Sequence, residues 1–164
     1  MFESLSIINF KDCKFLTHLP SLREVPLLTF LCLDYCSNLV EIDGSIGFLD
    51  KLLILSAKVC SKLKILAPCI MLTSLEILDL AWCLCLEGFP EVLVRMEKIR
   101  EIYFDNTAIG TLPFSIGNLV GLELLSLEQC ERLIQLPGSI FILSLDSKLT
   151  RLLQPSLSGH GRIS

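Results

Sequence analysis

The sequence predicts an α/β fold, a leucine-rich repeat solenoid of about six repeats. Cysteines recur every 23 or 24 residues along most of the chain, and apolar residues occupy the same places around each of them. A period of about 20 to 29 residues with this leucine spacing is the signature of a coil in which each turn adds one short strand. We therefore expect a curved coil with a parallel β-sheet on its concave face and an irregular, short-helical convex side.

The repeat has the form L-x-x-L-x-L-x-x-C-x-x-L-x-x-L-P, and it recurs six times in one register. Six residues occupy its cysteine position: Cys13, Cys36, Cys60, Cys83, Thr107 and Cys130. We expect residues 2–143 to form one leucine-rich repeat domain of about six repeats of 23 or 24 residues. For residues 144–164 we expect a degenerate last turn followed by a disordered tail rich in glycine and serine.

The centre of each repeat alternates apolar and polar residues, which predicts a short strand with one buried face. One turn leaves its apolar top and bottom open, and stacking the next turn covers them. Leu33, Leu80 and Leu127 hold the same place in three different repeats. We therefore predict that these leucines face inward on parallel strands that lie side by side.

The cysteine position follows the predicted strand, at a corner where buried backbone groups need hydrogen-bond partners. A small side chain that can hydrogen-bond fits this structural ladder, and Thr107 supports the interpretation because threonine is a poor zinc ligand. The alternative is a metal-binding cysteine ladder. Zinc sites usually contain close cysteine pairs, and the close pairs here, Cys32/Cys36 and Cys83/Cys85, share members with the ladder. We expect no metal, with the metalloprotein as the distant alternative.

The residues between the inward leucines form an outward strand face, and this face is the predicted partner-binding surface. Three aromatic residues stand on it where the core does not require them, and such side chains often anchor protein interfaces. Its acidic residues favour a basic partner. The candidate contact residues are Asp34, Tyr35, Lys58, Asp79, Trp82, Tyr103, Asp105 and Glu128. The alternative is a face that is only solvated or packed within the molecule.

Several function classes are disfavoured, and we expect no enzyme. Neither His18 nor His160 lies in a recognisable catalytic motif, and the chain has no phosphate-binding G-x-x-x-x-G-K-[ST] loop. A net charge of −4 without a basic stripe argues against nucleic acid. The longest charge-free stretch, 106–122, contains glycines and a proline and does not predict a membrane span. Eight cysteines without a secretory signal predict reduced thiols in the cytosol or nucleus.

The L-x-L-x-x-C-x-x-L-x-x-L-P segments, with Thr107–Ile116 reading T-A-I-G-T-L-P-F-S-I, resemble a known family. They are similar to the leucine-rich region of plant TIR-NB-LRR disease resistance proteins of the TMV resistance protein N-like group. The resemblance implies an intracellular immune receptor in which this region senses pathogen effectors and holds the nucleotide-binding switch inactive. It implies three kinds of protein partner: an effector, a guarded host protein, or the receptor's own nucleotide-binding domain.

No segment resembles a TIR domain or a nucleotide-binding module, so we expect no cofactor in this chain; the ADP or ATP that the family implies would bind elsewhere. Because Met1 opens directly into a repeat, we expect a fragment or a truncated product. The alternative function is a generic intracellular signalling scaffold of the L-x-x-L-P-x-x-I-G-x-L type, which shares the same repeat physics.

Overall fold

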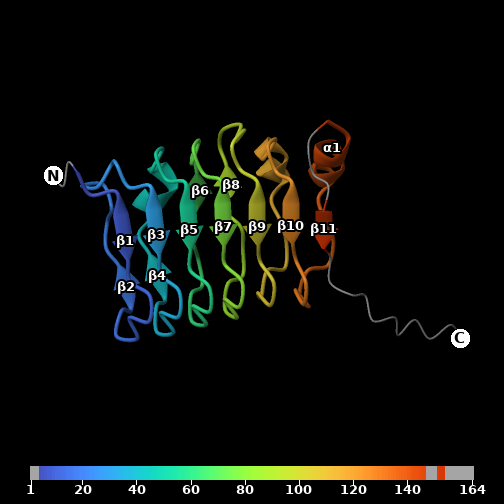
Figure 1. Cartoon of the computed structure of the whole chain (residues 1–164). Helices are drawn as coiled ribbons and strands as arrows, with labels where there is room; N and C mark the ends of the chain where they lie inside the picture. Colours follow the sequence, from blue (N-terminus) through green and yellow to red (C-terminus); the bar gives the residue numbers. More distant parts are fainter. Residues whose placement is uncertain (1–3, 147–150, 154–164) are drawn as a thin grey trace, which may run out of the picture.

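The computed structural model describes residues 4–146 and 151–153, which wind into one coil of parallel strands (Figure 1). Neighbouring strands of the main sheet pair in parallel and follow one another along the chain. The seven strands are β1 (Ile7–Asn9), β3 (Phe30–Cys32), β5 (Ile54–Ser56), β7 (Ile77–Asp79), β9 (Glu101–Tyr103), β10 (Leu124–Ser126) and β11 (Arg151–Leu153). Each of the six predicted repeats contributes one strand, and the leucine-rich repeat solenoid is confirmed. The seventh strand, β11, pairs with β10.

Equivalent positions of successive repeats pair directly across the main sheet. Leu55 of β5 lies between Leu31 of β3 and Leu78 of β7, and Leu31 and Leu55 are fully buried. Burial contributes about 1.5–3 kcal/mol for each such side chain, and each turn supplies the cover for the turn before it. The predicted inward leucines Leu33, Leu80 and Leu127 are also completely buried, one residue beyond the ends of their strands.

A left-handed backbone turn follows each of the first six strands of the sheet. The φ angles of these turns lie between 57° and 64°, and the residues are Asp12, Tyr35, Val59, Trp82, Asn106 and Gln129. In the first five turns the amide of this residue donates to a carbonyl of the next coil, as when Tyr35 N–H donates to the Lys58 carbonyl at 2.8 Å. The left-handed region costs a residue with a Cβ roughly 1–2 kcal/mol, so these hydrogen bonds between coils hold the strained turns.

The cysteine ladder lies immediately inside these turns. Each of the four buried ladder cysteines donates its thiol to a backbone carbonyl of a preceding coil, as when Cys60 Sγ donates to Leu33 O at 3.0 Å. The other three such pairs are Cys36–Phe10, Cys83–Ala57 and Cys130–Phe104, each at 3.1 Å. The side chain of Thr107 contacts Cys130 Sγ at 3.4 Å. Cys13, on the first coil, is exposed.

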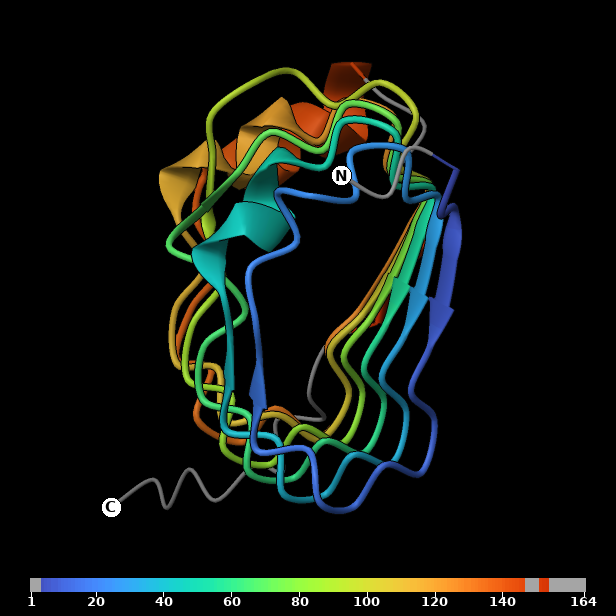
Figure 2. The same cartoon turned by 90° about the vertical axis from the view of Figure 1, so that its left-hand side faces the viewer.

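The return path on the other side of the coil is less regular, as the end-on view shows (Figure 2). Its helical segments are η1 (Gly44–Phe48), η2 (Phe114–Asn118) and α1 (Ser139–Asp146). Two two-stranded sheets, β2–β4 and β6–β8, are formed by β2 (His18–Leu19), β4 (Glu41–Ile42), β6 (Cys69–Ile70) and β8 (Glu91–Val92). The short helices agree with the expected convex side, whereas the small sheets and the eight-residue α1 were not expected.

Within the described residues, no helix reaches the length and apolar character that crossing a bilayer requires. The residues expected to form a disordered tail, 156–164, lie outside the part of the chain that the structure describes. The boundary between the repeat domain and the last turn therefore stays a prediction.

Candidate protein-binding surface

The candidate surface is the outward side of the main sheet, which we call the sheet face. In each of the first six strands of the main sheet, it consists of the outward residue that ends the strand and of the second and third residues after that one. In the repeat of β7 these residues are Asp79, Ala81 and Trp82. All eight candidate contact residues belong to these three rows, because the strands pair without a shift in register.

The centre of the sheet face contains a hollow of about 480 Å³, which we call the Trp82 hollow. Its lining brings together residues of three consecutive repeats: Lys58, Asp79, Ala81, Trp82, Tyr103 and Asp105. Five of these six were candidates from the sequence. Trp82 is 51% exposed, although most tryptophan side chains of folded proteins are largely buried. The left-handed turn at Trp82 holds this side chain beside the strand end rather than in the core.

Charges in the Trp82 hollow are partly matched within it. Lys58 Nζ lies 2.9 Å from Asp79 Oδ2, and this hydrogen bond with Asp79 raises the pKa of Lys58. Asp79 Oδ1 also accepts a hydrogen bond from Ala81 N at 3.1 Å. At the next strand the hydroxyl of Tyr103 donates to Glu101 Oε2 at 2.7 Å, which brings another carboxylate close to the aromatic ring.

Two of the candidate acidic residues also connect neighbouring coils. Asp34 Oδ1 accepts hydrogen bonds from Ser56 Oγ at 2.6 Å and from Lys58 N at 2.9 Å. Asp105 repeats this arrangement with the next coil, where its Oδ1 accepts from the Ser126 hydroxyl and from Glu128 N. These carboxylates satisfy backbone and hydroxyl donors of the sheet face, so removing either one would disturb the fold as well as a partner contact.

The remaining candidates do not line the Trp82 hollow. Tyr35 is 43% exposed, and Lys11 Nζ lies 5.7 Å from the centre of its ring, within cation–π range. Asp34 and Glu128 stand on the same face on either side of the hollow. The eight predicted residues therefore share one surface, but only five of them form a common site.

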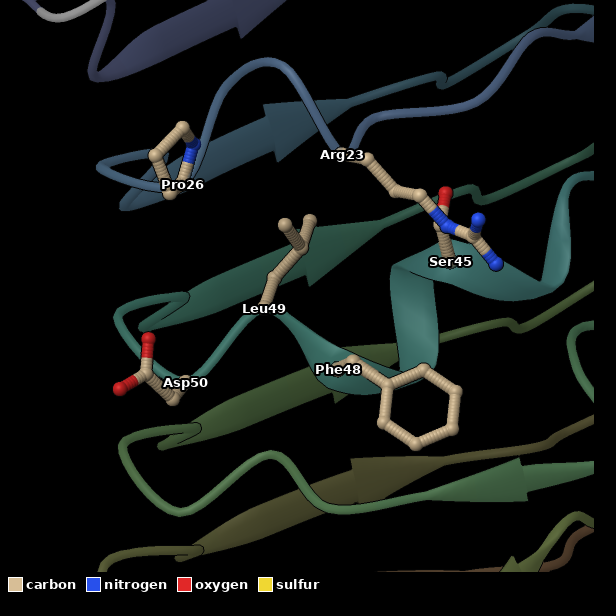
Figure 3. A pocket seen from close by; sticks show the side chains of 6 residues that line it. All are labelled: Arg23, Pro26, Ser45, Phe48, Leu49 and Asp50. Carbon is tan, nitrogen blue, oxygen red and sulfur yellow. The ribbon is translucent and has the colours of Figure 1, made fainter.

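A second hollow, of about 420 Å³, lies on the return path, and sequence reasoning missed it (Figure 3). Its lining is Arg23, Pro26, Ser45, Phe48, Leu49 and Asp50. Arg23 and Ser45 lie together in the view, with Phe48 and Asp50 farther along η1 and the segment after it. The sequence signal for this hollow is Phe48, an aromatic side chain that is 55% exposed and lies on the return path, outside the rows of strand residues.

The arrangement of the ladder thiols does not favour the metal-binding alternative. All eight cysteines are free thiols. The four buried ladder thiols donate hydrogen bonds to backbone carbonyls and do not converge on a common point where a metal ion could bind. Burial raises the pKa of Cys36 to about 11, which disfavours the thiolate that zinc requires. Among residues 4–146 and 151–153, no three His, Cys, Asp or Glu side chains gather into a group that could hold a metal ion.

Parallel strands at this period, those from β3 to β10 each followed by a buried Cys or Thr corner, define a leucine-rich repeat protein. Residues 71–149 match the leucine-rich repeat family of RPS4B-like disease resistance proteins. Disease resistance protein RPP2A of Arabidopsis thaliana is 36% identical over 136 residues, which are 83% of this chain and 10% of the relative. TMV resistance protein N of Nicotiana glutinosa is 34% identical over 161 residues, 98% of this chain and 14% of the relative.

The chain is thus a leucine-rich repeat region homologous to those of plant TIR-NB-LRR disease resistance proteins. Disease resistance protein RPS4B of Arabidopsis thaliana, 30% identical over 86% of this chain and 11% of its own length, agrees with this assignment. The resemblance inferred from the repeat motifs is confirmed, and it favours the resistance proteins over a generic scaffold. The chain spans about a tenth of the length of these relatives, and its matched residues are leucine-rich repeats, not a nucleotide-binding module.

Proposed function

We propose that this chain is the protein-binding repeat module of an intracellular plant immune receptor, and that the sheet face is its binding surface. The module acts in the cytosol or nucleus, where its partner is a pathogen effector, a guarded host protein or the receptor's own nucleotide-binding domain. Homology to disease resistance proteins supports the defence role. The repeat coil serves as a rigid scaffold for contact residues and carries no chemistry of its own in this proposal.

The observation that carries the proposal is the exposed Trp82 in a hollow of a rigid sheet. Tryptophan is one of the residue types that are enriched among binding hot spots. The left-handed turn and the hydrogen bond from Trp82 N to Asp105 O at 2.7 Å hold its backbone in one place. A partner would therefore meet a preorganised ring, and little conformational entropy would be lost on binding.

In-cell photo-crosslinking from two positions of equal exposure tests the proposal. A photoreactive phenylalanine analogue replaces Trp82 on the sheet face or Leu93 after β8 on the return path, which are 51% and 55% exposed. Expressed in plant leaf cells, the chain should form a specific adduct from position 82 and none of the same identity from position 93. The adduct partner, identified by mass spectrometry and purified, should bind Trp82→Ala at least about tenfold more weakly than Leu93→Ala.

The opposite pattern would refute the sheet face as the binding surface. Adducts that form only from position 93, or a purified partner whose Kd is unchanged by Trp82→Ala, would move the contact to the return path. Circular dichroism of each variant provides the folding control, because both side chains lie outside the core.

A further inference from the structure

The Trp82 hollow exists because one residue of its row is small. The second residue after each strand end on the sheet face is a charged residue in every repeat except one: Lys11, Asp34, Lys58, Asp105 and Glu128, with Ala81 as the exception. Ala81 therefore forms the floor, and the larger side chains of Lys58 and Asp105 form walls on either side along the coil. A partner side chain can enter here without displacing any core residue.

The walls of the hollow offer aromatic faces and a carboxylate oxygen. Trp82 and Tyr103 line it together, and within the described residues the indole N–H of Trp82 has no hydrogen-bond partner. Both hydrogen bonds accepted by Asp105 use Oδ1. Its Oδ2 receives none from the described part of the chain, so one oxygen of an ionised carboxylate remains available to a donor on a ligand.

The charge of the hollow is negative once its internal ion pair is counted. The charge of Lys58 is matched by Asp79 at 2.9 Å, which leaves Asp105 as the unmatched charge of the lining. Glu101, which accepts from the Tyr103 hydroxyl, brings a second carboxylate to a lining residue, and Glu128 follows Asp105 in the same row on the next coil. The site therefore complements a cation and repels an acidic side chain.

We propose that the Trp82 hollow receives an arginine side chain of the partner protein, an inference that rests on the sheet face being the binding surface. A guanidinium is planar, stacks on aromatic rings and presents several N–H donors at once. It can stack on Trp82 while donating to Asp105 Oδ2. A lysine ammonium is a compact, strongly hydrated charge and has no plane to stack, so the aromatic walls favour arginine.

Trp82 is the chain's single tryptophan, so its fluorescence and its indole N–H signal report on this hollow alone. The probe is the blocked tripeptide Gly-Arg-Gly, titrated into the purified chain, with Gly-citrulline-Gly and Gly-Lys-Gly as controls. Citrulline has nearly the shape of arginine without its charge. The arginine peptide should shift the indole signal saturably, with a Kd on the order of millimolar. It should bind about tenfold more tightly than the citrulline peptide, whose neutral ureido group can donate to Asp105 but forms no ion pair with it.

Two variants locate the effect in the hollow. Ala81→Met places a long side chain inside the hollow and should abolish the shift of the indole signal. Leu93→Ala on the return path should leave this shift unchanged. Asp105→Asn keeps an acceptor for Ser126 and for the Glu128 amide but removes the charge, and it should weaken the arginine peptide by about tenfold. Ala81→Met decides the question if Asp105→Asn proves unstable.

Several outcomes would overturn the arginine assignment. These are equal binding of the citrulline or lysine peptide, no saturable shift, or an unchanged shift in Ala81→Met. An indole shift that depends on protein concentration without any peptide would assign the hollow to a second copy of the chain. If the arginine peptide fails while position 82 still crosslinks a partner, the proposed function stands and only this inference falls. If both fail, the sheet face is not the binding surface.

Discussion

The two sides of the coil solve the same stacking problem in different ways. On the sheet side, every repeat from β1 to β10 uses a three-residue strand followed by a left-handed turn. On the return side, successive repeats use extended chain, a 3₁₀-helix, a two-residue strand or an α-helix. Consecutive strands begin 23 or 24 residues apart up to β10, but β11 begins 27 residues after β10, at 151 against 124. The return path, which contains α1 in that last coil, absorbs the extra residues.

The difference shows where the repeats are constrained. Strand positions exchange backbone hydrogen bonds with both neighbouring coils, so a change in length there would break two ladders at once. Return segments also form backbone hydrogen bonds to neighbouring coils, but each small sheet there joins only two strands, whereas the main sheet joins seven. Their conformation can therefore vary as long as the buried residue is kept. Ile46 in η1, Ile70 in β6 and Ile116 in η2 hold such a buried place in two different conformations, a 3₁₀-helix and a short strand.

The largest effect is expected where the core adjoins the sheet. Leu80→Asp buries an unpaired charge at a completely buried position, which should lower the free energy of unfolding by more than about 4 kcal/mol. Loss of the β-sheet circular dichroism signal or a large drop in the urea midpoint would show it. The control is Leu93→Asp, an exposed position on the return side, which should change stability by less than about 0.5 kcal/mol. A folded Leu80→Asp protein would contradict the register of the sheet.

The next largest effect tests the close backbone approaches of the return side. A Cβ at Gly121 would lie 2.2 Å from the Glu97 carbonyl oxygen, whereas a Cβ at Gly88 would meet nothing within 4 Å. Gly121→Ala should therefore destabilise the chain by about 1–3 kcal/mol through overpacking. Gly88→Ala should be neutral or stabilise it by up to about 1 kcal/mol. Urea denaturation of the pair measures both, and equal midpoints would mean that this part of the return path moves freely.

A pair of serines at equivalent return positions should behave oppositely. Ser45 Oγ accepts the buried Leu22 N–H at 2.8 Å, whereas Ser139 Oγ is buried without a hydrogen-bond partner in the described residues. Ser45→Ala should cost about 1–3 kcal/mol because it leaves the Leu22 amide unpaired. Ser139→Ala should be neutral or slightly stabilising, because it removes an unsatisfied hydroxyl. Thermal unfolding followed by circular dichroism compares them, and a costly Ser139→Ala would reveal a partner for that hydroxyl.

The smallest effect concerns the strained turns of the sheet side. Val59 is β-branched and has a φ of 61°, whereas Asn106 occupies the equivalent turn with a residue that tolerates it better. Val59→Asn should raise the free energy of unfolding by about 1 kcal/mol, and the reciprocal Asn106→Val should lower it by about as much. The shift in melting temperature of both variants measures the effect. Shifts of the same sign would mean that side-chain packing, and not backbone strain, dominates these positions.

Most of the fold could be predicted from the sequence, because the repeat presents the same pattern of apolar residues six times. The rows of outward residues derived from the motif are the rows that the strand register produces, so Asp79 and Tyr103 pair as neighbours. The Trp82 hollow itself was not predicted. Its floor depends on Ala81, a residue with no distinguishing chemistry, and on the direction that a left-handed turn imposes on Trp82.

Periodicity alone determined that this chain is a coil, which residues face inward, and which family it resembles. These properties depend on spacing along the chain, because leucines that recur at a fixed interval are buried when each turn stacks on the turn before it. Only the tertiary structure decided that Lys58 and Asp79 form an ion pair, that Asp34 and Asp105 connect coils, and that the return path mixes helices with small sheets. Such features arise from contacts between residues of different turns, where distance and direction in space, rather than sequence interval, determine the interaction.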